Sequence, residues 1–448
     1  MQKNNKMAVM PMPSLVLDMS LPMMFSLLIQ SAYNIVDSIF VARLSENALT
    51  ATSLAYPVQM LMIAVGVGTA VGLNAILSRT LGAGKTDEAS QVAATGVLLA
   101  VLSALFFTVC GLLFADRLAS AFTSVEEIRQ QCSDYLFICM VFCLGNLVCM
   151  MYQRLMQATG RTLLSMMILG AGAITNIILD PIMIFGLLGC PALGIRGAAI
   201  ATVVGQWVSM FVGFFLQETF NKEIHIRFRG FQLRKDRVLS IYRVGFPTIV
   251  TQALNSMMVT AFNAILQPFS TTAVAFFGVY YKLQNFLFMP MNGLGQASIP
   301  IIAFNLGAKN KKRLTEAVKI VYPTAIGIAL LGTLLFRLFP ARLLGLFSAG
   351  EEMLSLGIPA LKIISLSFAF ASATMISGYI ASGLQDGITN MICAFLRQFC
   401  PLIPCAYLLA SHLGLDRVWY AIWISETCAL IFAVLRIRFL LKAKLKNL

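Results

Sequence analysis

The sequence has 448 residues, of which 58% are hydrophobic and only 12% are charged. Soluble domains carry about 25% charged residues, so this composition excludes an ordinary soluble protein and predicts a polytopic membrane protein. The net charge of +14 does not indicate a nucleic-acid partner, because Lys and Arg gather between alternate apolar segments.

The first apolar segment, 15–42, carries a polar stripe. Nothing before it has the apolar core and cleavage site of a signal peptide, so we expect it to stay as a membrane span. Four side chains follow the spacing i, i+3, i+4 and i+7, which places them on one helix face: Gln30, Tyr33, Asn34 and Asp37. Such a face is costly against lipid and should meet protein or a water-filled cavity. Asp37 is the strongest functional candidate, with hydrogen bonding to a neighbouring helix as the structural alternative.

Twelve apolar spans follow one another along the chain. Each span needs roughly 20 apolar residues, and the stretches are 15–42, 49–78, 90–113, 128–151, 163–188, 195–217, 238–267, 272–303, 317–338, 355–381, 389–411 and 418–440. With both termini in the cytoplasm, 23 of the 33 Lys and Arg residues fall in inner segments and eight in outer ones. The positive-inside rule therefore predicts cytoplasmic termini.

The two halves of the chain repeat. An ungapped offset of 225 residues aligns Pro22 with Pro247 and the Leu-Gly-Ala tripeptide at 81–83 with its copy at 306–308. Each half holds six spans, so both enter the membrane from the same side and the repeat is parallel, an arrangement in which transporters bind substrate between the halves. The predicted fold is an all-α membrane protein of twelve helices in two six-helix lobes, with an N-terminal lobe at 1–217, a basic cytoplasmic linker at 218–237 and a C-terminal lobe at 238–448.

Span five adds a second intramembrane acid to the first half. Asp180 follows Asn176 by four residues, so the two side chains share a helix face. Pro181 should break or kink the helix, and a local cap for that kink is the structural alternative for Asp180. Because Asp37 and Asp180 each have a carboxamide on their own face, we favour a shared site that binds H+ or Na+.

The second half lacks an acid at the position that matches Asp37, where Phe262 stands. Its spans offer polar and flexible side chains for an adaptable substrate cavity, and the candidates are Gln252, Asn255, Gln284 and Met289. Glu426 stands alone in span twelve, and a structural and a functional role are both open for it. Lys282 and Arg397 also lie within spans. One interpretation is that they balance charge in the second half; the one that we favour is that both side chains snorkel toward the membrane surface.

Several motifs together resemble the multidrug and toxic compound extrusion (MATE) family. The likeness covers nearly all of the chain, and its specificity comes from the combination rather than from one motif. The motifs are Q..YN.VDSIFV.RL at 30–44, A..LAYP at 51–57, LGAGK at 81–85, QATG at 157–160, N..LDP at 176–181, GAAIAT at 197–202 and FNLGAKN at 304–310.

The resemblance implies twelve helices in two lobes, alternating access, and export of drug-like, often cationic compounds in exchange for H+ or Na+. It also implies a cation site in the N-terminal lobe at Asp37, Asn176, Asp180 and Thr202, with Gln30, Tyr33 and Asn34 nearby. Other members carry acids in spans seven and ten. This sequence lacks them, so the resemblance does not extend to a second cation site.

We therefore expect a monomeric, cation-coupled antiporter in a plasma (inner) membrane. It should export small xenobiotic molecules, contact membrane lipid, and need no cofactor beyond its coupling ion. The alternative is a flippase for a lipid-linked precursor, which would favour a strongly basic central cavity. Among the basic residues, however, we count only Lys282 and Arg397 as lying within spans rather than toward their ends or in the flanking segments. A membrane-embedded enzyme should show a metal or nucleophile constellation. None is visible, so we expect neither enzymatic activity nor a metal other than Na+ at Asp37 and Asp180.

Overall fold

The computed structural model describes residues 5–226, 231–347 and 350–446. All regular elements in these ranges are helices. Eleven helical segments are long and apolar enough to cross a bilayer, and one bent helix pair makes a twelfth if it counts as one span. The predicted all-α membrane fold with twelve spans is therefore confirmed.

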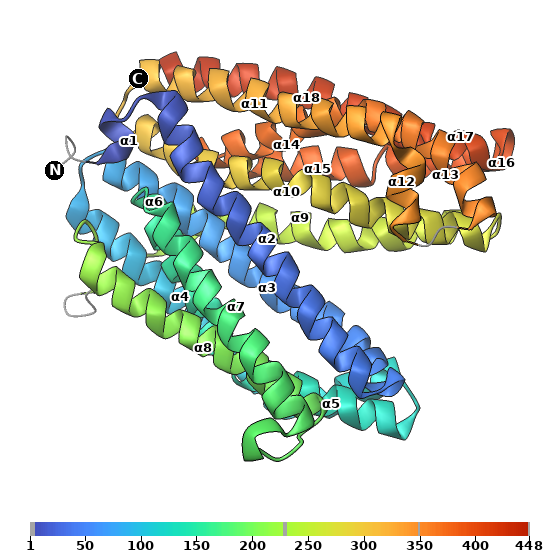
Figure 1. Ribbon diagram of the computed structural model, residues 1–448. Helices are drawn as coiled ribbons and strands as arrows, with labels where there is room; N and C mark the ends of the chain where they lie inside the picture. The colour runs from blue at the N-terminus through green and yellow to red at the C-terminus, as the bar shows by residue number, and fades with distance from the viewer. Residues whose placement is uncertain (1–4, 227–230, 348–349, 447–448) are drawn as a thin grey trace. The chain divides into compact units, whose positions relative to one another are not determined.

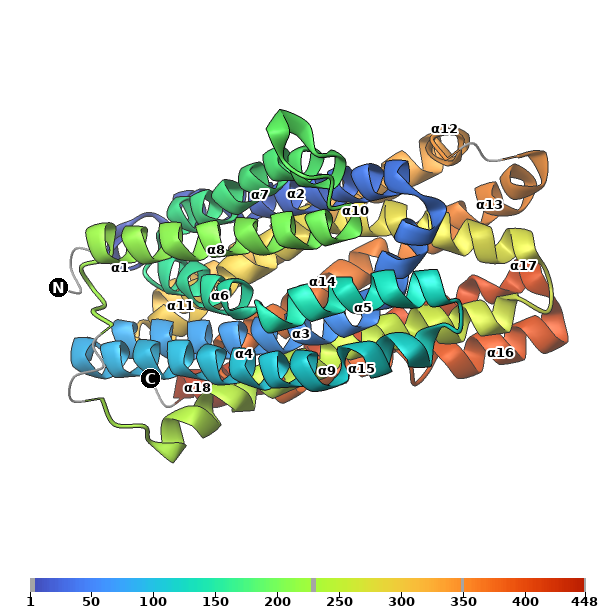
Figure 2. The same cartoon turned by 90° about the horizontal axis from the view of Figure 1, so that it is seen from below.

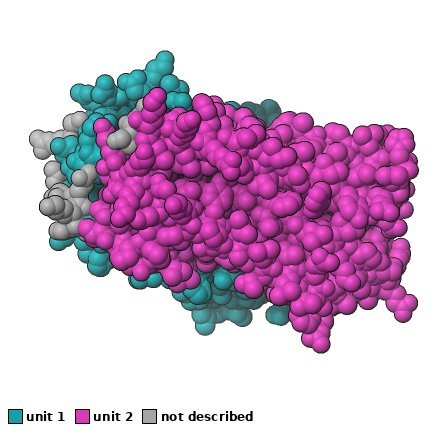
Figure 3. Space-filling model, turned by 90° about the horizontal axis from the view of Figure 1, so that it is seen from above, with its two compact units in different colours: residues 1–5, 25–246 teal, residues 6–24, 247–448 magenta. Residues whose placement is uncertain are grey.

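The chain packs into two compact units, coloured in Figure 3. Unit 1 holds residues 1–5 and 25–246, and unit 2 holds residues 6–24 and 247–448. Two long helices, α2 (Met12–Leu44) and α9 (Lys235–Leu266), each contribute residues to both units. The lobe and linker boundaries expected from the sequence stay a prediction, and residues 227–230 of that linker lie outside the described residues.

The other helices each belong to one unit. Figures 1 and 2 show them along the chain, coloured by residue number. Unit 1 contains α3 (Glu46–Gly82), α4 (Thr86–Phe122), α5 (Glu126–Val141), α6 (Leu144–Ala158), α7 (Thr162–Phe185), the short η2 (Leu187–Gly189) and α8 (Ile195–Phe220). Unit 2 contains α1 (Lys6–Val9), α10 (Thr271–Gly307), α11 (Lys311–Leu338), α12 (Pro340–Gly345), α13 (Glu351–Ile364), η3 (Ser365–Ser367), α14 (Phe368–Gly383), α15 (Gly387–Gln398), α16 (Leu402–Leu413), α17 (Leu415–Val418) and α18 (Tyr420–Lys446).

The sequence repeat reappears in the helix starts. Five pairs of helices begin 225 residues apart: α3 and α10, α4 and α11, α5 and α13, α7 and α15, and α8 and α18. The N-caps of the first pair also match, because the hydroxyl of Ser45 accepts a hydrogen bond from the Ala48 amide and that of Ser270 accepts one from the Ala273 amide. A side-chain cap satisfies an otherwise unpaired amide at the start of a helix. The repeat therefore extends to the local hydrogen bonds that set helix boundaries.

The span expected at 128–151 is divided into α5 and α6, which meet at an angle of 47°. A break inside a membrane span frees backbone carbonyls that lipid cannot satisfy. Here the Thr108 hydroxyl donates to the Val141 carbonyl at 2.9 Å, and the Trp207 indole donates to the Phe142 carbonyl at 3.1 Å. Side chains from α4 and α8 thus stabilise a bend that the apolar sequence of this segment does not indicate.

Glycines bring α7 and α8 into close backbone contact. A Cβ atom added at Gly205 would lie 2.7 Å from the carbonyl oxygen of Gly172, and one added at Gly197 would lie 2.3 Å from that of Met183. Small residues at such positions let membrane helices approach closely. A Cβ atom added at Gly205 would also lie 3.3 Å from the Cβ of Asn176. This close packing of α7 and α8 therefore helps to position a candidate site residue.

Replacing Gly205 with Ala is expected to lower the free energy of unfolding by about 1–3 kcal/mol, because the methyl group has no space between the two backbones. Gly170→Ala is the matched control on α7. A Cβ there meets nothing within 4 Å, and we expect it to be neutral or stabilising by up to about 1 kcal/mol, since Ala favours helix. Thermal unfolding of the two purified variants gives the comparison, and equal unfolding temperatures would contradict the packing argument.

Candidate cation site

One buried turn of α7 carries two of the expected site residues. Asp180 is fully buried and Asn176 nearly so. The Asn176 amide nitrogen donates to Oδ1 of Asp180 at 3.2 Å and to the hydroxyl of Thr202 on α8 at 3.3 Å. Because an amide nitrogen has only two hydrogens, both are used, and Asn176 holds the acid and Thr202 together.

Asp37 reaches the same place from α2. Its side chain is half-buried, and its carboxyl group lies within hydrogen-bonding reach of the Asp180 carboxyl group. Two carboxylates this close repel each other unless a proton or another cation lies between them. The structure therefore brings together Asp37, Asn176, Asp180 and Thr202, all within unit 1.

The cluster contains buried oxygen atoms without a hydrogen-bond donor. Within the described ranges, Oδ1 of Asp37, Oδ1 of Asn176 and Oδ2 of Asp180 have no partner. A buried acceptor without a donor costs roughly 1–3 kcal/mol, and more when it is charged. A proton shared by the two acids, or a Na+ ion bound through these oxygens, would remove that cost.

Pro181 does not break its helix, so of the break or kink expected from the sequence only a kink within a continuous helix stays a prediction. α7 runs without interruption from Thr162 to Phe185 with Pro181 inside it. Proline has no amide hydrogen, so the carbonyl of Ile177, four residues earlier, loses its usual donor. Asp180 therefore lies inside a continuous helix rather than at a helix end.

Three neighbours of the acids were not identified from the sequence. The Gln59 amide nitrogen on α3 lies 3.4 Å from the Tyr135 hydroxyl and 3.6 Å from the Cys139 sulfur on α5. Tyr135 lies within electrostatic range of both acids, and Cys139 lies within electrostatic range of Asp37. One signal was present, because the repeat aligns Gln59 with Gln284, so both halves carry glutamine at this position.

The expected substrate-contacting residues lie in both units. On α2, Gln30 and Tyr33 are half-buried and Asn34 is exposed; Tyr33 also interacts electrostatically with Asp37. In unit 2, Gln252 is exposed, and Met289 and Gln284 are half-buried. Asn255 accepts a hydrogen bond from Gln398. Their part in substrate binding stays a prediction.

Unit 2 has an aromatic core where the repeat would place the first acid. Phe262, which matches Asp37, is fully buried. Its ring stacks on Phe277 with centroids 4.5 Å apart and lies 6.3 Å from Trp419. An ionised side chain at this position would lose its solvation without gaining a partner, so the candidate cation site belongs to unit 1 alone.

Comparison with known proteins gives consistent matches over most of the chain. A family model described as MatE matches residues 22–182 and 247–408. A protein of Thermotoga maritima named "Probable multidrug resistance protein NorM" is 25% identical and covers 96% of this chain and 92% of its own length. "Multidrug export protein MepA" of Staphylococcus haemolyticus is 27% identical, with coverages of 92% and 90%.

Solved structures share the fold. A MOP superfamily transporter from Pyrococcus furiosus superposes with a TM-score of 0.90 at 24% identity, covering 99% of this chain and 98% of that chain. A structure described as the outward-facing conformation of a multidrug resistance MATE family transporter gives a TM-score of 0.87 at 24% identity, with 96% of both chains covered.

Proposed function

The chain belongs to the MatE family, and from that premise we propose that it exports drug-like compounds in exchange for H+ or Na+ by alternating access. The family match confirms the resemblance seen in the motifs, and the many apolar helices make the chain a multi-pass membrane protein. The curated relatives named multidrug resistance or multidrug export proteins support the export of drugs. Neither the family match nor these relatives favours a flippase.

The observation that carries cation coupling is the cluster of unpartnered oxygens at Asp37, Asn176 and Asp180. A proton would bind between the two carboxyl groups. Na+ would take oxygen ligands from the same side chains, with the hydroxyl of Thr202 as a further ligand. Both ions neutralise charge at the place where α2 and α7 meet, which is the change that coupling requires.

In the proposed coupling, the charge of Asp37 and Asp180 sets the affinity for the substrate. With the acids ionised, unit 1 holds negative charge that favours a cationic substrate. When the inward gradient loads the site, this charge disappears and the substrate is released. Each net charge that crosses 100 mV contributes about 2.3 kcal/mol. One ion exchanged for a monovalent cation moves no net charge, so that exchange draws on the concentration gradient of the ion alone. We propose that Gln30, Tyr33 and Asn34 of α2, with Gln252, Asn255, Gln284 and Met289 of unit 2, contact the substrate.

A proteoliposome assay tests this function. The purified protein is reconstituted with a fluorescent organic cation as cargo, and a pH gradient and a Na+ gradient are imposed separately. We expect one of the two gradients to drive export against the cargo's own gradient. Protein-free vesicles control for leakage, and cargo movement that ignores both ions would refute coupling.

We further propose that both chain ends and the central linker face the cytoplasm of a plasma membrane, with the protein acting as a monomer. Lys222 is exposed at the start of this linker. An impermeant thiol reagent added to intact cells should not label a cysteine at position 222. Native Cys190, exposed in the loop before α8, should be labelled, because it lies on the predicted outer side. Labelling at position 222 without labelling of Cys190 would mean that the topology is the opposite of the one proposed.

A further inference from the structure

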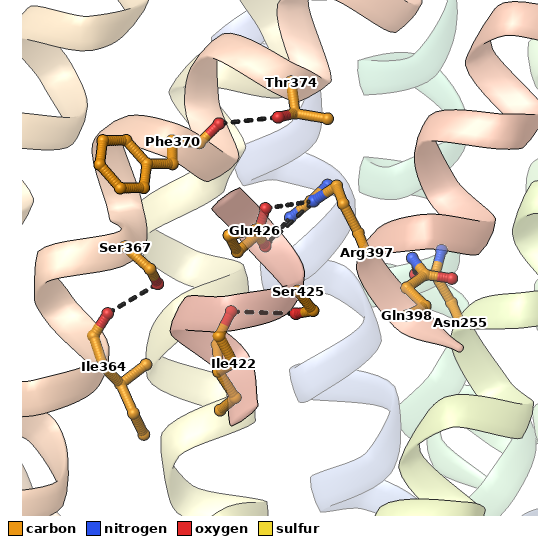
Figure 4. Close-up of polar contacts among 10 residues, drawn as sticks. All are labelled: Asn255, Ile364, Ser367, Phe370, Thr374, Arg397, Gln398, Ile422, Ser425 and Glu426. Atoms are coloured by element: carbon orange, nitrogen blue, oxygen red, sulfur yellow. Dashed lines mark hydrogen bonds and ion pairs between the residues drawn. The ribbon is translucent and has the colours of Figure 1, made fainter. Parts of the chain in front are cut away.

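Two charges buried in unit 2 neutralise each other. Arg397 on α15 and Glu426 on α18 point toward each other (Figure 4); Nε of the arginine lies 2.8 and 3.0 Å from the two carboxylate oxygens, and Nη2 lies 2.8 Å from one of them. The Glu426 side chain is 5% exposed and that of Arg397 is 15% exposed. Arg397 therefore does not snorkel, contrary to the expectation from sequence, because its partner lies on α18. The pair presents no net charge to a ligand.

Two cations at the start of α9 have no such carboxylate partner. Lys235 is the first residue of α9 and is exposed, and Arg237 is half-buried. Among the described residues, neither side chain forms an ion pair, and the nearby acids Glu88 and Asp236 pair with other cations. Instead, Nη1 of Arg237 donates to Oε1 of Gln91 on α4 at 3.4 Å and to a backbone carbonyl of the linker at 2.9 Å. The guanidinium is thus held between the starts of α4 and α9.

An apolar groove lies between α3, α4 and α9 within unit 1. Its volume is about 360 Å³, and it is lined by Val65 of α3, five residues of α4 from Leu99 to Phe107, and Tyr242 of α9. Leu102 and Phe106 belong to this lining and are 48% and 63% exposed, so one side of the groove is open. α4 is one of the membrane-spanning helices, and lipid tails are as apolar as these side chains. The groove therefore opens toward lipid.

A close backbone contact fixes the α9 wall of this groove. A Cβ atom added at Gly72 of α3 would lie 2.1 Å from the carbonyl oxygen of Ile241 on α9, so no side chain fits between the two helices there. The hydroxyl groups of Tyr242 and Thr69 lie 3.4 Å apart at the same contact. The ring of Tyr242 is therefore held in place, and the groove is formed before any ligand enters, as is usual for ligand sites.

The groove and the two cations lie on the same helix faces. Lys235 precedes Tyr242 by seven residues, so both side chains share one face of α9 and are about 10 Å apart along its axis. On α4, Gln91, which contacts Arg237, precedes Leu102 by eleven residues, or about three turns. The cations therefore lie beyond one end of the groove, where the polar end of a ligand chain would emerge.

We propose that the groove binds one acyl chain of an anionic phospholipid and that the lipid phosphate contacts Lys235 and Arg237. The volume is near the lower end of ligand pockets, roughly 300–1,000 Å³, which suits a single chain. Basic pockets between helices on the cytoplasmic side of a membrane attract anionic headgroups, and the start of α9 follows the basic linker on the predicted cytoplasmic side. None of the lining residues belongs to the candidate cation site, so this is a second, separate site of unit 1.

Quenching of a tryptophan in the groove by brominated lipid tests the proposal. Phe106→Trp, the groove reporter, places an indole in the lining. Leu112→Trp, the surface reporter, is the matched control, because Leu112 is 57% exposed on the same helix and outside the lining. Each full-length variant is reconstituted in equal mixtures of phosphatidylglycerol and phosphatidylcholine with one of the two lipids brominated, and the wild type corrects for the three native tryptophans.

We expect the groove reporter to favour phosphatidylglycerol by about tenfold, the effect of one or two cations on an anionic lipid, and the surface reporter to show no such preference. Lys235→Gln with Arg237→Gln should remove the preference. Lys235 is exposed, so Lys235→Gln alone leaves the fold intact and should lower it about threefold. Lys311→Gln with Lys312→Gln removes two exposed charges at the start of α11 and should change nothing.

Equal lipid preference at the two reporters would overturn the proposal. A preference that survives Lys235→Gln with Arg237→Gln would also overturn it, and so would an equal loss in the α11 variant, because the attraction would then come from overall surface charge. Ser103→Phe fills the groove and leaves both cations in place. A preference that survives this substitution would mean that the acyl chain lies elsewhere. The readout is lipid binding, so the outcome does not depend on the proposed export function.

Discussion

Replacing Asp37 with Asn is expected to abolish net export while the protein still reaches the membrane. The variant carries a permanently neutral group, so the site cannot alternate between an ionised state that favours substrate and a loaded state that releases it. Asp37 is half-buried, and the amide is nearly isosteric with the acid, so folding should be preserved. Dye uptake into everted vesicles, which corresponds to export from the cell, measures the effect after normalisation to the amount of protein in the membrane.

Asp180→Asn should give the same result, and the double variant should be no worse than either single one. The two carboxyl groups are in hydrogen-bonding reach, and residues that act as one unit do not have additive effects. Phe262→Leu, at the matching position of unit 2, is the control and should keep ion coupling at some cost in packing. Near wild-type, gradient-dependent efflux by Asp37→Asn would mean that the coupling ion binds elsewhere.

Replacing Glu426 with Leu should lower the free energy of unfolding by about 3–5 kcal/mol, because a buried guanidinium then has no counter-charge. The unfolding temperature of the purified variant in detergent should fall clearly. Adding Arg397→Met removes the uncompensated charge, and this double variant should recover most of the loss. A single variant as stable as the wild type would show that the pair contributes nothing to folding.

Much of the architecture could be predicted from the sequence because lipid imposes simple constraints. Span length, the alternating Lys and Arg content and the repeat offset all leave direct signals, and the offset even matches five pairs of helix starts. The bend between α5 and α6 could not be predicted in this way. Its freed carbonyls are satisfied by Thr108 and Trp207 on other helices, and such tertiary contacts leave no pattern within the segment that bends.

The candidate site, like the fold, could be predicted from the sequence only in part. Asp37, Asn176 and Asp180 stand out because polar groups are rare in apolar spans. Gln59 and Tyr135 were missed because neither residue type is conspicuous there, although the repeat pairs Gln59 with another glutamine. The snorkelling expected of Arg397 was wrong because its partner is 29 residues away, and an ion pair between helices leaves no short-range signal.

The central claim is that one site of unit 1 holds the coupling ion and thereby controls substrate affinity. By thermodynamic linkage, an ion that weakens substrate binding must itself be bound more weakly when substrate is present. The direct measurement is the dissociation constant of a fluorescent cation for the purified protein, titrated separately with H+ and with Na+. We predict that one ion raises the dissociation constant of the wild type and that the dependence disappears in Asp37→Asn with Asp180→Asn. A dependence that persists unchanged in the double variant would contradict the claim.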